Sequence, residues 1–221
     1  SRFVSDASHE LRTPLTALLA ANEVASMNPK LTLKQAKQGI ADNVDDVKRL
    51  QKLTNSMLGL LKEDKLEIQK GKVGLQPVIT RAMNLVVNQA LAKDIAIDDK
   101  TKNFLLLGDR QSLEQLFTIL LDNAIKYSNK GGTITISSSK KGKHVSVAIA
   151  DAGIGMSDEV KSQIFTRFYR AEESRTTAGY GLGLSIAERI IKAHGGRINV
   201  DSEQNVGSTF TVILPAYNKK K

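Results

Sequence analysis

Apolar side chains recur at steps of three and four positions along the N-terminal part of the chain. Between residues 3 and 26 the repeating positions are Phe3, Ala7, Leu11, Leu15, Leu18 and Asn22. This spacing predicts a helix with one buried side. Asn28 and Pro29 interrupt the pattern, and a second periodic run begins near Thr32. Its repeating positions are Ala36, Ile40, Asn43, Val47, Leu50, Thr54, Met57 and Leu61.

A hairpin of two helices cannot enclose a hydrophobic core by itself. Pairing with a second copy gives a four-helix bundle, which is the simplest way to cover both apolar stripes. We therefore expect residues 1–64 to form a dimeric four-helix bundle. The polar Asn43 and Thr54 within the second stripe are candidates for fixing its register.

The pattern changes after residue 64. The charged segment 65–72, with Gly71 at its end and Gly74 just beyond, predicts a linker. Helical patterns then cover 76–93, 109–127, 157–166 and 182–194, and strand patterns cover 103–107, 133–138, 145–150, 197–201 and 209–214. Asp109 is a suitable N-cap for the helix at 109–127. Strands with intervening helices predict that 73–221 fold as an α/β sandwich, with the helices on one face of the sheet.

Composition narrows the possible chemistry. The 221 residues are 41% hydrophobic, as in ordinary globular proteins, and include no cysteine, so disulfides, thiolate metal sites and cysteine nucleophiles are excluded. The net charge of +9 has no accompanying run of basic and aromatic residues, so we expect no nucleic-acid partner. The chain starts at Ser1 inside a predicted helix, and we expect it to be a fragment of a longer protein.

His9 is the candidate nucleophile of the first helix. It lies two positions from Ala7 and from Leu11, which places it about 200° from each at 100° per residue, away from the buried stripe. Glu10 is adjacent, and Thr13 follows one turn later on the same face. A carboxylate that accepts one ring N–H leaves the other nitrogen free to attack. The alternative reading is an ordinary surface histidine.

The helix at 109–127 offers a candidate site for a metal and phosphates. Asn123 lies among apolar neighbours, and its amide oxygen is a hard ligand suited to Mg²⁺ that also holds substrate phosphates. Lys126 and Tyr127 follow as candidate phosphate contacts. The alternative is that Asn123 is an ordinary polar residue of a helix.

Two glycine-containing segments favour a nucleotide pocket. Asp151 ends a predicted strand, where it can accept a hydrogen bond from an exocyclic amine, and Gly153 and Gly155 let the backbone approach a ligand closely. The segment 179–184 leads into a helix, an arrangement suited to phosphate. It contains Gly179, Gly181, Leu182, Gly183 and Leu184.

The residues before the second glycine segment suggest a moving part. The polar stretch 171–180 is interpreted as a mobile lid over the nucleotide. Arg167 or Arg170 is placed to neutralise charge on a transferred phosphoryl group. Phe165 and Phe168 are interpreted as core residues rather than ligand contacts.

Taken together, these motifs resemble those of one family. Segments 3–15, 122–128, 151–155, 164–169 and 179–184 are similar, in this order, to the H, N, first glycine, phenylalanine and second glycine boxes of bacterial sensor histidine kinases. The chain resembles their cytoplasmic core: a HisKA dimerisation and phosphoacceptor domain followed by a GHKL-type ATP-binding domain. The resemblance covers essentially the whole chain.

The resemblance implies a role for each candidate residue. His9 would accept the γ-phosphoryl group of ATP, with Glu10 as base and as the group that orients the ring. Asn123 would ligate Mg²⁺, and Asp151 would read the adenine amine. The residues facing the phosphates would be Lys126, Tyr127 and Arg167.

The resemblance also implies partners and a location. The chain would form a homodimer through 1–64 and pass its phosphoryl group to an aspartate in the receiver domain of a response regulator. Thr13, with Glu10, matches the pattern in which a water is positioned to dephosphorylate that regulator. The chain would be the cytoplasmic portion of a membrane-anchored bacterial sensor, touching the membrane only through segments absent from it.

Three alternatives remain open at this stage. The chain could be a GHKL ATPase that acts by conformational change, a pseudokinase dimer that acts by protein interaction, or a protein whose regulator dephosphorylation outweighs its kinase activity. Whether the nucleotide domain would phosphorylate His9 of its own chain or of its partner also stays open.

Overall fold

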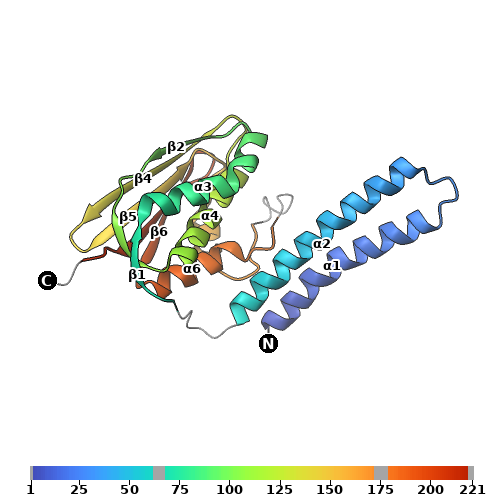
Figure 1. The fold of residues 1–221 in the computed structure, drawn as a ribbon, viewed down its shortest axis with the longest axis horizontal. Helices are drawn as coiled ribbons and strands as arrows, with labels where there is room; N and C mark the ends of the chain where they lie inside the picture. Colours follow the sequence, from blue (N-terminus) through green and yellow to red (C-terminus); the bar gives the residue numbers. More distant parts are fainter. Residues whose placement is uncertain (1, 62–67, 172–178, 219–221) are drawn as a thin grey trace. The chain divides into compact units, whose positions relative to one another are not determined.

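The computed structural model of the chain describes residues 2–61, 68–171 and 179–218. The chain divides into two compact units, Ser1–Asp64 and Lys65–Lys221. The first is a helical hairpin and the second a mixed α/β unit (Figure 1). Both descriptions agree with the fold class predicted from the sequence.

The hairpin consists of α1 (Arg2–Ser26) and α2 (Leu33–Leu61). A capping box begins the second helix: Gln35 N donates to Thr32 Oγ1 at 3.3 Å, and Thr32 N donates to Gln35 Oε1 at 3.0 Å. This reciprocal arrangement satisfies two backbone donors that the helix itself cannot pair. The predicted start of the helix near Thr32 is confirmed.

One of the two polar residues of the second stripe joins the helices. Asn43 Nδ2 donates to Asn22 Oδ1 at 2.8 Å, and Asn22 Nδ2 donates to Asn43 Oδ1 at 3.2 Å. Such a reciprocal amide pair forms only when the two residues face each other, so it favours one register of α1 against α2. Thr54 instead donates to the Leu50 carbonyl of its own helix at 3.0 Å. A role for either residue in the register of a dimer stays a prediction.

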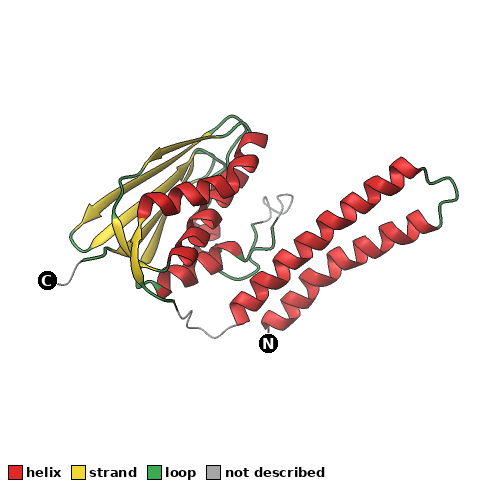
Figure 2. Ribbon diagram, in the orientation of Figure 1, coloured by secondary structure: helices red, strands yellow, loops and turns green. Residues whose placement is uncertain are grey.

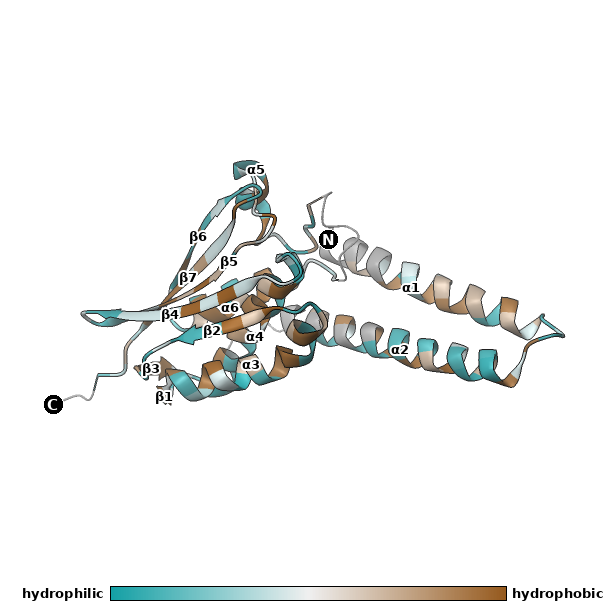
Figure 3. Cartoon of the chain, turned by 90° about the horizontal axis from the view of Figure 1, so that it is seen from above, coloured by the Kyte–Doolittle hydropathy of each residue, from teal (hydrophilic) through white to brown (hydrophobic). Residues whose placement is uncertain are grey.

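Part of the predicted apolar stripe remains uncovered in the single hairpin. Ala36 and Leu50 are partly buried, whereas the side chains of Ile40 and Val47 are 63% and 54% exposed. Leu19 of α1 is 59% exposed. Figure 3 shows hydrophobic segments at intervals along both helices. The hairpin therefore presents apolar surface that its own two helices do not cover.

The second unit is built on a five-stranded sheet with the order β2-β4-β5-β7-β6. Its strands are β2 (Ala96–Lys100), β4 (Thr133–Lys141), β5 (His144–Asp151), β6 (Arg197–Glu203) and β7 (Gly207–Pro215). The pair β2 and β4 is parallel, and the other neighbours are antiparallel. A separate two-stranded antiparallel sheet joins β1 (Gly71–Gly74) to β3 (Leu105–Gly108).

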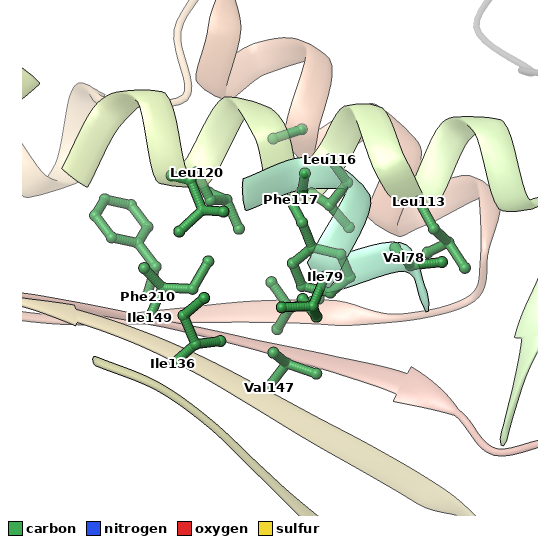
Figure 4. Close-up of a cluster of buried hydrophobic side chains, with 14 of the residues drawn as sticks. Val78, Ile79, Leu113, Leu116, Phe117, Leu120, Ile136, Val147, Ile149 and Phe210 are labelled. Atoms are coloured by element: carbon green, nitrogen blue, oxygen red, sulfur yellow. The ribbon is translucent and has the colours of Figure 1, made fainter. Parts of the chain in front are cut away.

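Helices α3 (Leu75–Ala92), α4 (Arg110–Tyr127) and α6 (Gly183–Ala193) lie on one face of the five-stranded sheet (Figure 2). A short helix, α5 (Asp158–Gln163), follows β5. Figure 4 shows the core between α4 and the strands, and its labelled residues are Val78, Ile79, Leu113, Leu116, Phe117, Leu120, Ile136, Val147, Ile149 and Phe210. The predicted placement of helices on one sheet face is confirmed.

Hydrogen bonds of one side chain join the C-terminal end of α6 to the N-terminal end of α4. Asp109 caps α4 as predicted, because its Oδ1 accepts from Ser112 N at 2.8 Å. The backbone N–H of Asp109 donates to Nε2 of His194 at 3.0 Å, and Nδ1 of His194 lies 2.8 Å from the Ile190 carbonyl. His194 is buried, which lowers the pKa of its ring. The neutral imidazole thus links the end of α6 to the start of α4.

Two local predictions are corrected. The interpretation of 65–72 as a linker is wrong at its end, since Gly71 and Lys72 belong to β1. Glycine carries no strand signal, and this segment becomes a strand because it pairs with β3. Strand β2 was missed because Asp98 and Asp99 oppose strand propensity; at the edge of a sheet such charges are tolerated.

Candidate functional site

Three segments that are distant in the sequence meet at the C-terminal end of α4. The loop after β5 joins it because Ile154 N donates to the Tyr127 carbonyl at 3.2 Å. The glycine segment before α6 also approaches it, since a Cβ at Gly179 would lie 3.8 Å from Lys126 Nζ. The structure therefore brings the last turn of α4 together with both predicted glycine segments.

Asp151 is the last residue of β5 and is half-buried. Its Oδ1 accepts from the backbone N–H of Gly153 at 2.9 Å, and Asp151 pairs with Ser208 of β7. Burial raises the pKa of Asp151, and hydrogen bonds from the backbone N–H groups of Gly153 and Ser208 oppose this rise. The result is a carboxyl group in fixed orientation, suited to accept a hydrogen bond from a ligand amine.

Positions 153 and 155, in the loop after Asp151, require glycine because neighbouring backbone leaves no room for a Cβ. A Cβ at Gly153 would lie 2.2 Å from the Tyr127 carbonyl oxygen. Gly155 has a φ of +62°, and a Cβ there would lie 1.8 Å from the Glu203 carbonyl oxygen. The sequence predicts that both glycines allow a ligand to approach closely. In the structure the groups that approach them are backbone carbonyls of the chain. Ligand contact by Gly153 and Gly155 stays a prediction.

The last turns of α4 carry the candidate metal and phosphate residues. Asn123 and Tyr127 are half-buried. Lys126 Nζ forms an ion pair with Asp122 Oδ2 at 2.6 Å. Within the described part of the chain, no three His, Asp or Glu side chains gather as a metal site. An Mg²⁺ held by the Asn123 amide oxygen would thus take most of its other ligands from phosphates and water, which is usual for this ion.

The glycine segment before α6 shapes a helix N-terminus. Gly181 has a φ of +67°, and its carbonyl accepts from Phe168 N at 2.9 Å. Leu182 precedes the helix, and its side chain has no acceptor to cap it. The first N–H groups and the dipole of α6 are therefore suited to an anion.

The side chains of the two leucines in this segment pack against the protein and are not presented to a ligand. The side chain of Leu182 is only 4% exposed, and Leu184 packs against the core. Nucleotide contact by Leu182 would therefore be made by its backbone. Phe165 packs against the core, as predicted. Phe168 is half-buried with a φ of +63°, a rare conformation for an aromatic residue, which its contact with Gly181 helps to fix.

The structure describes the remaining candidate site residues only in part. Arg167 is exposed and Arg170 is half-buried. Of the predicted lid 171–180, residues 172–178 lie outside the described residues. His9 and Glu10 lie in α1, but their side chains also lie outside the described residues, so the predicted outward direction of His9 stays a prediction. Thr13 is exposed on α1.

Two contributors to the site were missed by the sequence reasoning. The backbone N–H of Ser208 supports Asp151 across the sheet, and Lys93 donates to carbonyls at the end of α4. The strand pattern that covers 209–214 could have suggested Ser208 once β5 and β7 were paired. No local signal marks Lys93, because a lysine near the end of a helix is common.

Comparison with known families covers both units. Residues 1–65 match the His Kinase A (phospho-acceptor) domain. Residues 108–218 match the family described as histidine kinase-, DNA gyrase B- and HSP90-like ATPase. The described residues include no helix with the length and apolar character needed to cross a membrane.

Individual relatives match the chain over different lengths. The sensor protein CiaH of Streptococcus pneumoniae is 33% identical over 230 residues, which cover 99% of this chain and 50% of CiaH. The chain thus spans about half the length of the curated relatives it matches. Among solved structures, the mycobacterial sensor histidine kinase MprB has a TM-score of 0.61 at 27% identity, covering 67% of this chain and 98% of that one.

A longer structural match extends across both units. The histidine kinase ThkA, in a crystal structure with the response regulator protein TrrA, has a TM-score of 0.78. The match covers 98% of this chain and 62% of ThkA at 24% identity. At that identity the likeness shows a shared fold.

Proposed function

We propose that this chain uses ATP to phosphorylate His9, because it belongs to the histidine kinase-, DNA gyrase B- and HSP90-like ATPase family and carries a His Kinase A phosphoacceptor domain. The catalytic core of bacterial two-component sensor kinases has the same combination. The observation that carries the proposal is the meeting of the α4 C-terminal end, the Asp151 loop and the glycine segment before α6, in one chain with that domain.

In the proposed reaction a ring nitrogen of His9 attacks the γ-phosphorus of ATP. A P–N bond forms, the bond to the β-phosphate bridging oxygen breaks, and ADP leaves. Glu10 accepts the ring proton and orients the imidazole. Such a transfer depends mainly on in-line positioning and on neutralising phosphate charge.

The second unit supplies positioning and charge. Asp151 accepts a hydrogen bond from the adenine amine, and the α6 N-terminus with Lys126 and Arg167 faces the phosphates. Asn123 would hold Mg²⁺, which supplies further neutralisation of phosphate charge. Lys126 must leave Asp122, or share it, to reach a phosphate, since the two form an ion pair.

The partners follow from the phosphoacceptor unit. We propose that a second copy covers the apolar surface at Leu19, Ile40 and Val47, giving a homodimer. The phosphoryl group then passes to an aspartate of a response regulator receiver domain. Thr13, with Glu10, positions a water that hydrolyses the phosphoaspartate of that regulator and releases inorganic phosphate. The relative CiaH is named a sensor protein, and we propose that this core acts on the cytoplasmic side of such a sensor.

Nucleotide binding tests the proposed site directly. The parent chain should bind ATP in the presence of Mg²⁺ when titrated in a calorimeter, and Asn123→Ala should bind it more weakly with a reduced dependence on Mg²⁺. Asp122→Asn keeps the amide at position 123 and is the neighbouring control, for which Mg²⁺ dependence should persist. A parent chain that binds no nucleotide, or one that hydrolyses ATP without becoming phosphorylated, would refute the kinase proposal; the second result would favour an ATPase.

Asp151→Asn should separate binding from stability. Loss of the charged acceptor should weaken ATP binding about 10- to 100-fold, the size expected for one hydrogen bond to a charged group. In the absence of nucleotide the same variant should be more stable than the parent at pH 7. Burial disfavours the charged form of Asp151 and raises its pKa, whereas an Asn carries no charge at that position.

The stability gain should depend on pH in one direction. Below pH 3.8, the ordinary pKa of an aspartate, the Asp151 carboxyl is protonated and its burial costs the fold no charge. As the pH rises through the higher folded-state pKa, the carboxyl ionises and the parent loses stability. The difference in unfolding free energy between Asp151→Asn and the parent should therefore be small near pH 3.8 and grow toward pH 7. Denaturant unfolding at a series of pH values measures it. A parent that is the more stable protein at pH 7 would disprove this reading of Asp151.

A further inference from the structure

The carbonyls at the C-terminal end of α4 are paired by groups outside the helix. Lys93 Nζ donates to the carbonyls of Ile125 at 3.0 Å, Lys126 at 2.7 Å and Ser128 at 3.0 Å. The Tyr127 carbonyl accepts from Ile154 N at 3.2 Å. An ammonium group has three donors, and here all three are directed to carbonyl oxygens. Lys93 is thus the main partner of the end of the helix that carries the proposed nucleotide contacts.

The backbone of Lys93 is fixed as firmly as its side chain. It is the C-cap of α3, where Asp94 adopts a φ of +52° and donates to the Leu91 carbonyl at 3.1 Å, and Ile95 N donates to the Ala90 carbonyl at 2.9 Å. These two bonds form a Schellman motif. The Lys93 carbonyl also accepts from Gly131 N, in the loop after α4, at 3.0 Å.

The hydrogen bonds of Lys93 affect the nucleotide contacts as well as the cap of α4. The C-terminal end of a helix carries partial negative charge, which a cation offsets. The turn that Lys93 holds includes Lys126 and Tyr127, with Asn123 one turn earlier. Through the Tyr127 carbonyl the same turn holds Ile154 in the loop that follows Asp151. Displacement of the turn would therefore move both the phosphate side and the adenine side of the site.

We propose that Lys93 is a positioning residue for the nucleotide site, whose ammonium group sets the last turn of α4 and, through Tyr127, the loop of Asp151. This inference rests on the proposed nucleotide site. All three hydrogen bonds of the Lys93 ammonium group go to backbone carbonyls. It acts by holding carbonyls, so a separate compact cation of the right length should be able to replace it.

Affinity for Mg²⁺-ATP, measured by calorimetry on the full chain, tests the proposal. Lys93→Met removes the ammonium group while keeping the stem and should weaken binding about tenfold, as expected for loss of a favourable charge at a helix end. Lys130→Met is the matched control: its ammonium lies in the same corner, 3.5 Å from Asp94 Oδ2 in an exposed ion pair, and its loss should change affinity less than about twofold.

Chemical rescue separates positioning from general destabilisation. In Lys93→Ala, propylammonium replaces the deleted atoms, and it should restore most of the lost affinity, whereas tetramethylammonium, which has no N–H donor, should not. The Ala variant purified in propylammonium also serves if Lys93→Met fails to fold. Unchanged affinity in Lys93→Met would overturn this inference and leave the proposed function standing. Weak binding by a folded Lys93→Ala chain that propylammonium does not improve would also overturn it. A parent chain without nucleotide affinity would overturn both.

Discussion

Gly155→Ala is expected to reduce ATP affinity more than about 30-fold and to destabilise the second unit by at least about 2 kcal/mol. The residue has a φ of +62°, and an added Cβ would lie 1.8 Å from the Glu203 carbonyl oxygen. The loop must move away to relieve this overlap. That movement would break the bond from Asn205 N to the Ile154 carbonyl, 2.6 Å long, and would displace the backbone next to Asp151. Calorimetry and denaturant unfolding measure the two effects.

Gly142→Ala provides the matched control for this prediction. Gly142 has a nearly equal φ of +59°, but a Cβ there would meet no atom within 4 Å, and the residue lies in the turn between β4 and β5. The substitution should cost about 1 kcal/mol from backbone strain and leave ATP affinity unchanged. Equal losses of affinity in the two variants would show that positive φ alone, and not the packing against Glu203, accounts for the effect at Gly155.

His9→Gln is expected to abolish phosphorylation while leaving ATP affinity unchanged. The carboxamide nitrogen of Gln is not nucleophilic, because its lone pair is delocalised, and Gln is a good helix former that preserves α1. Incorporation of phosphate should fall below about 1% of the parent level, since no other group on this helix has the imidazole's reactivity. Labelling with radioactive ATP at matched protein concentration measures this.

A second histidine offers a control of the same chemistry. His144 is exposed at the start of β5, so its imidazole is also accessible to solvent. His144→Gln should be phosphorylated at the parent rate. Label retained by His9→Gln and lost by His144→Gln would place the acceptor in the wrong unit and reject the assignment of His9.

The elements that sequence predicted well are those specified by neighbouring residues. The cap of α4 follows from Asp109 and Ser112, three positions apart, and the start of α2 follows from Thr32 and Gln35. Strands β5 and β7 alternate apolar and polar residues because one face packs on the helices. Their combination led to the two-unit description that the family matches support.

The elements that were missed depend on residues far apart in the chain. β1 exists through pairing with β3, and Lys93 meets Ile125 and Ser128 across more than 30 positions. The glycines after Asp151 were recognised as points of close approach, but their neighbours, Tyr127 and Glu203, were not. Periodicity identifies the buried face of an element; it does not identify which distant backbone atom will lie against it.

Phosphorylation of His9 by ATP is tested by the chemical nature of the phosphoryl bond and by its location in the chain. The full chain should be incubated with radiolabelled ATP and Mg²⁺, exposed separately to acid and to base, and digested to locate the label. A phosphorylated His9 should give a label that is lost in acid and kept in base, on the peptide containing His9. No label, an acid-stable label, or a label on a peptide from 65–221 would contradict it.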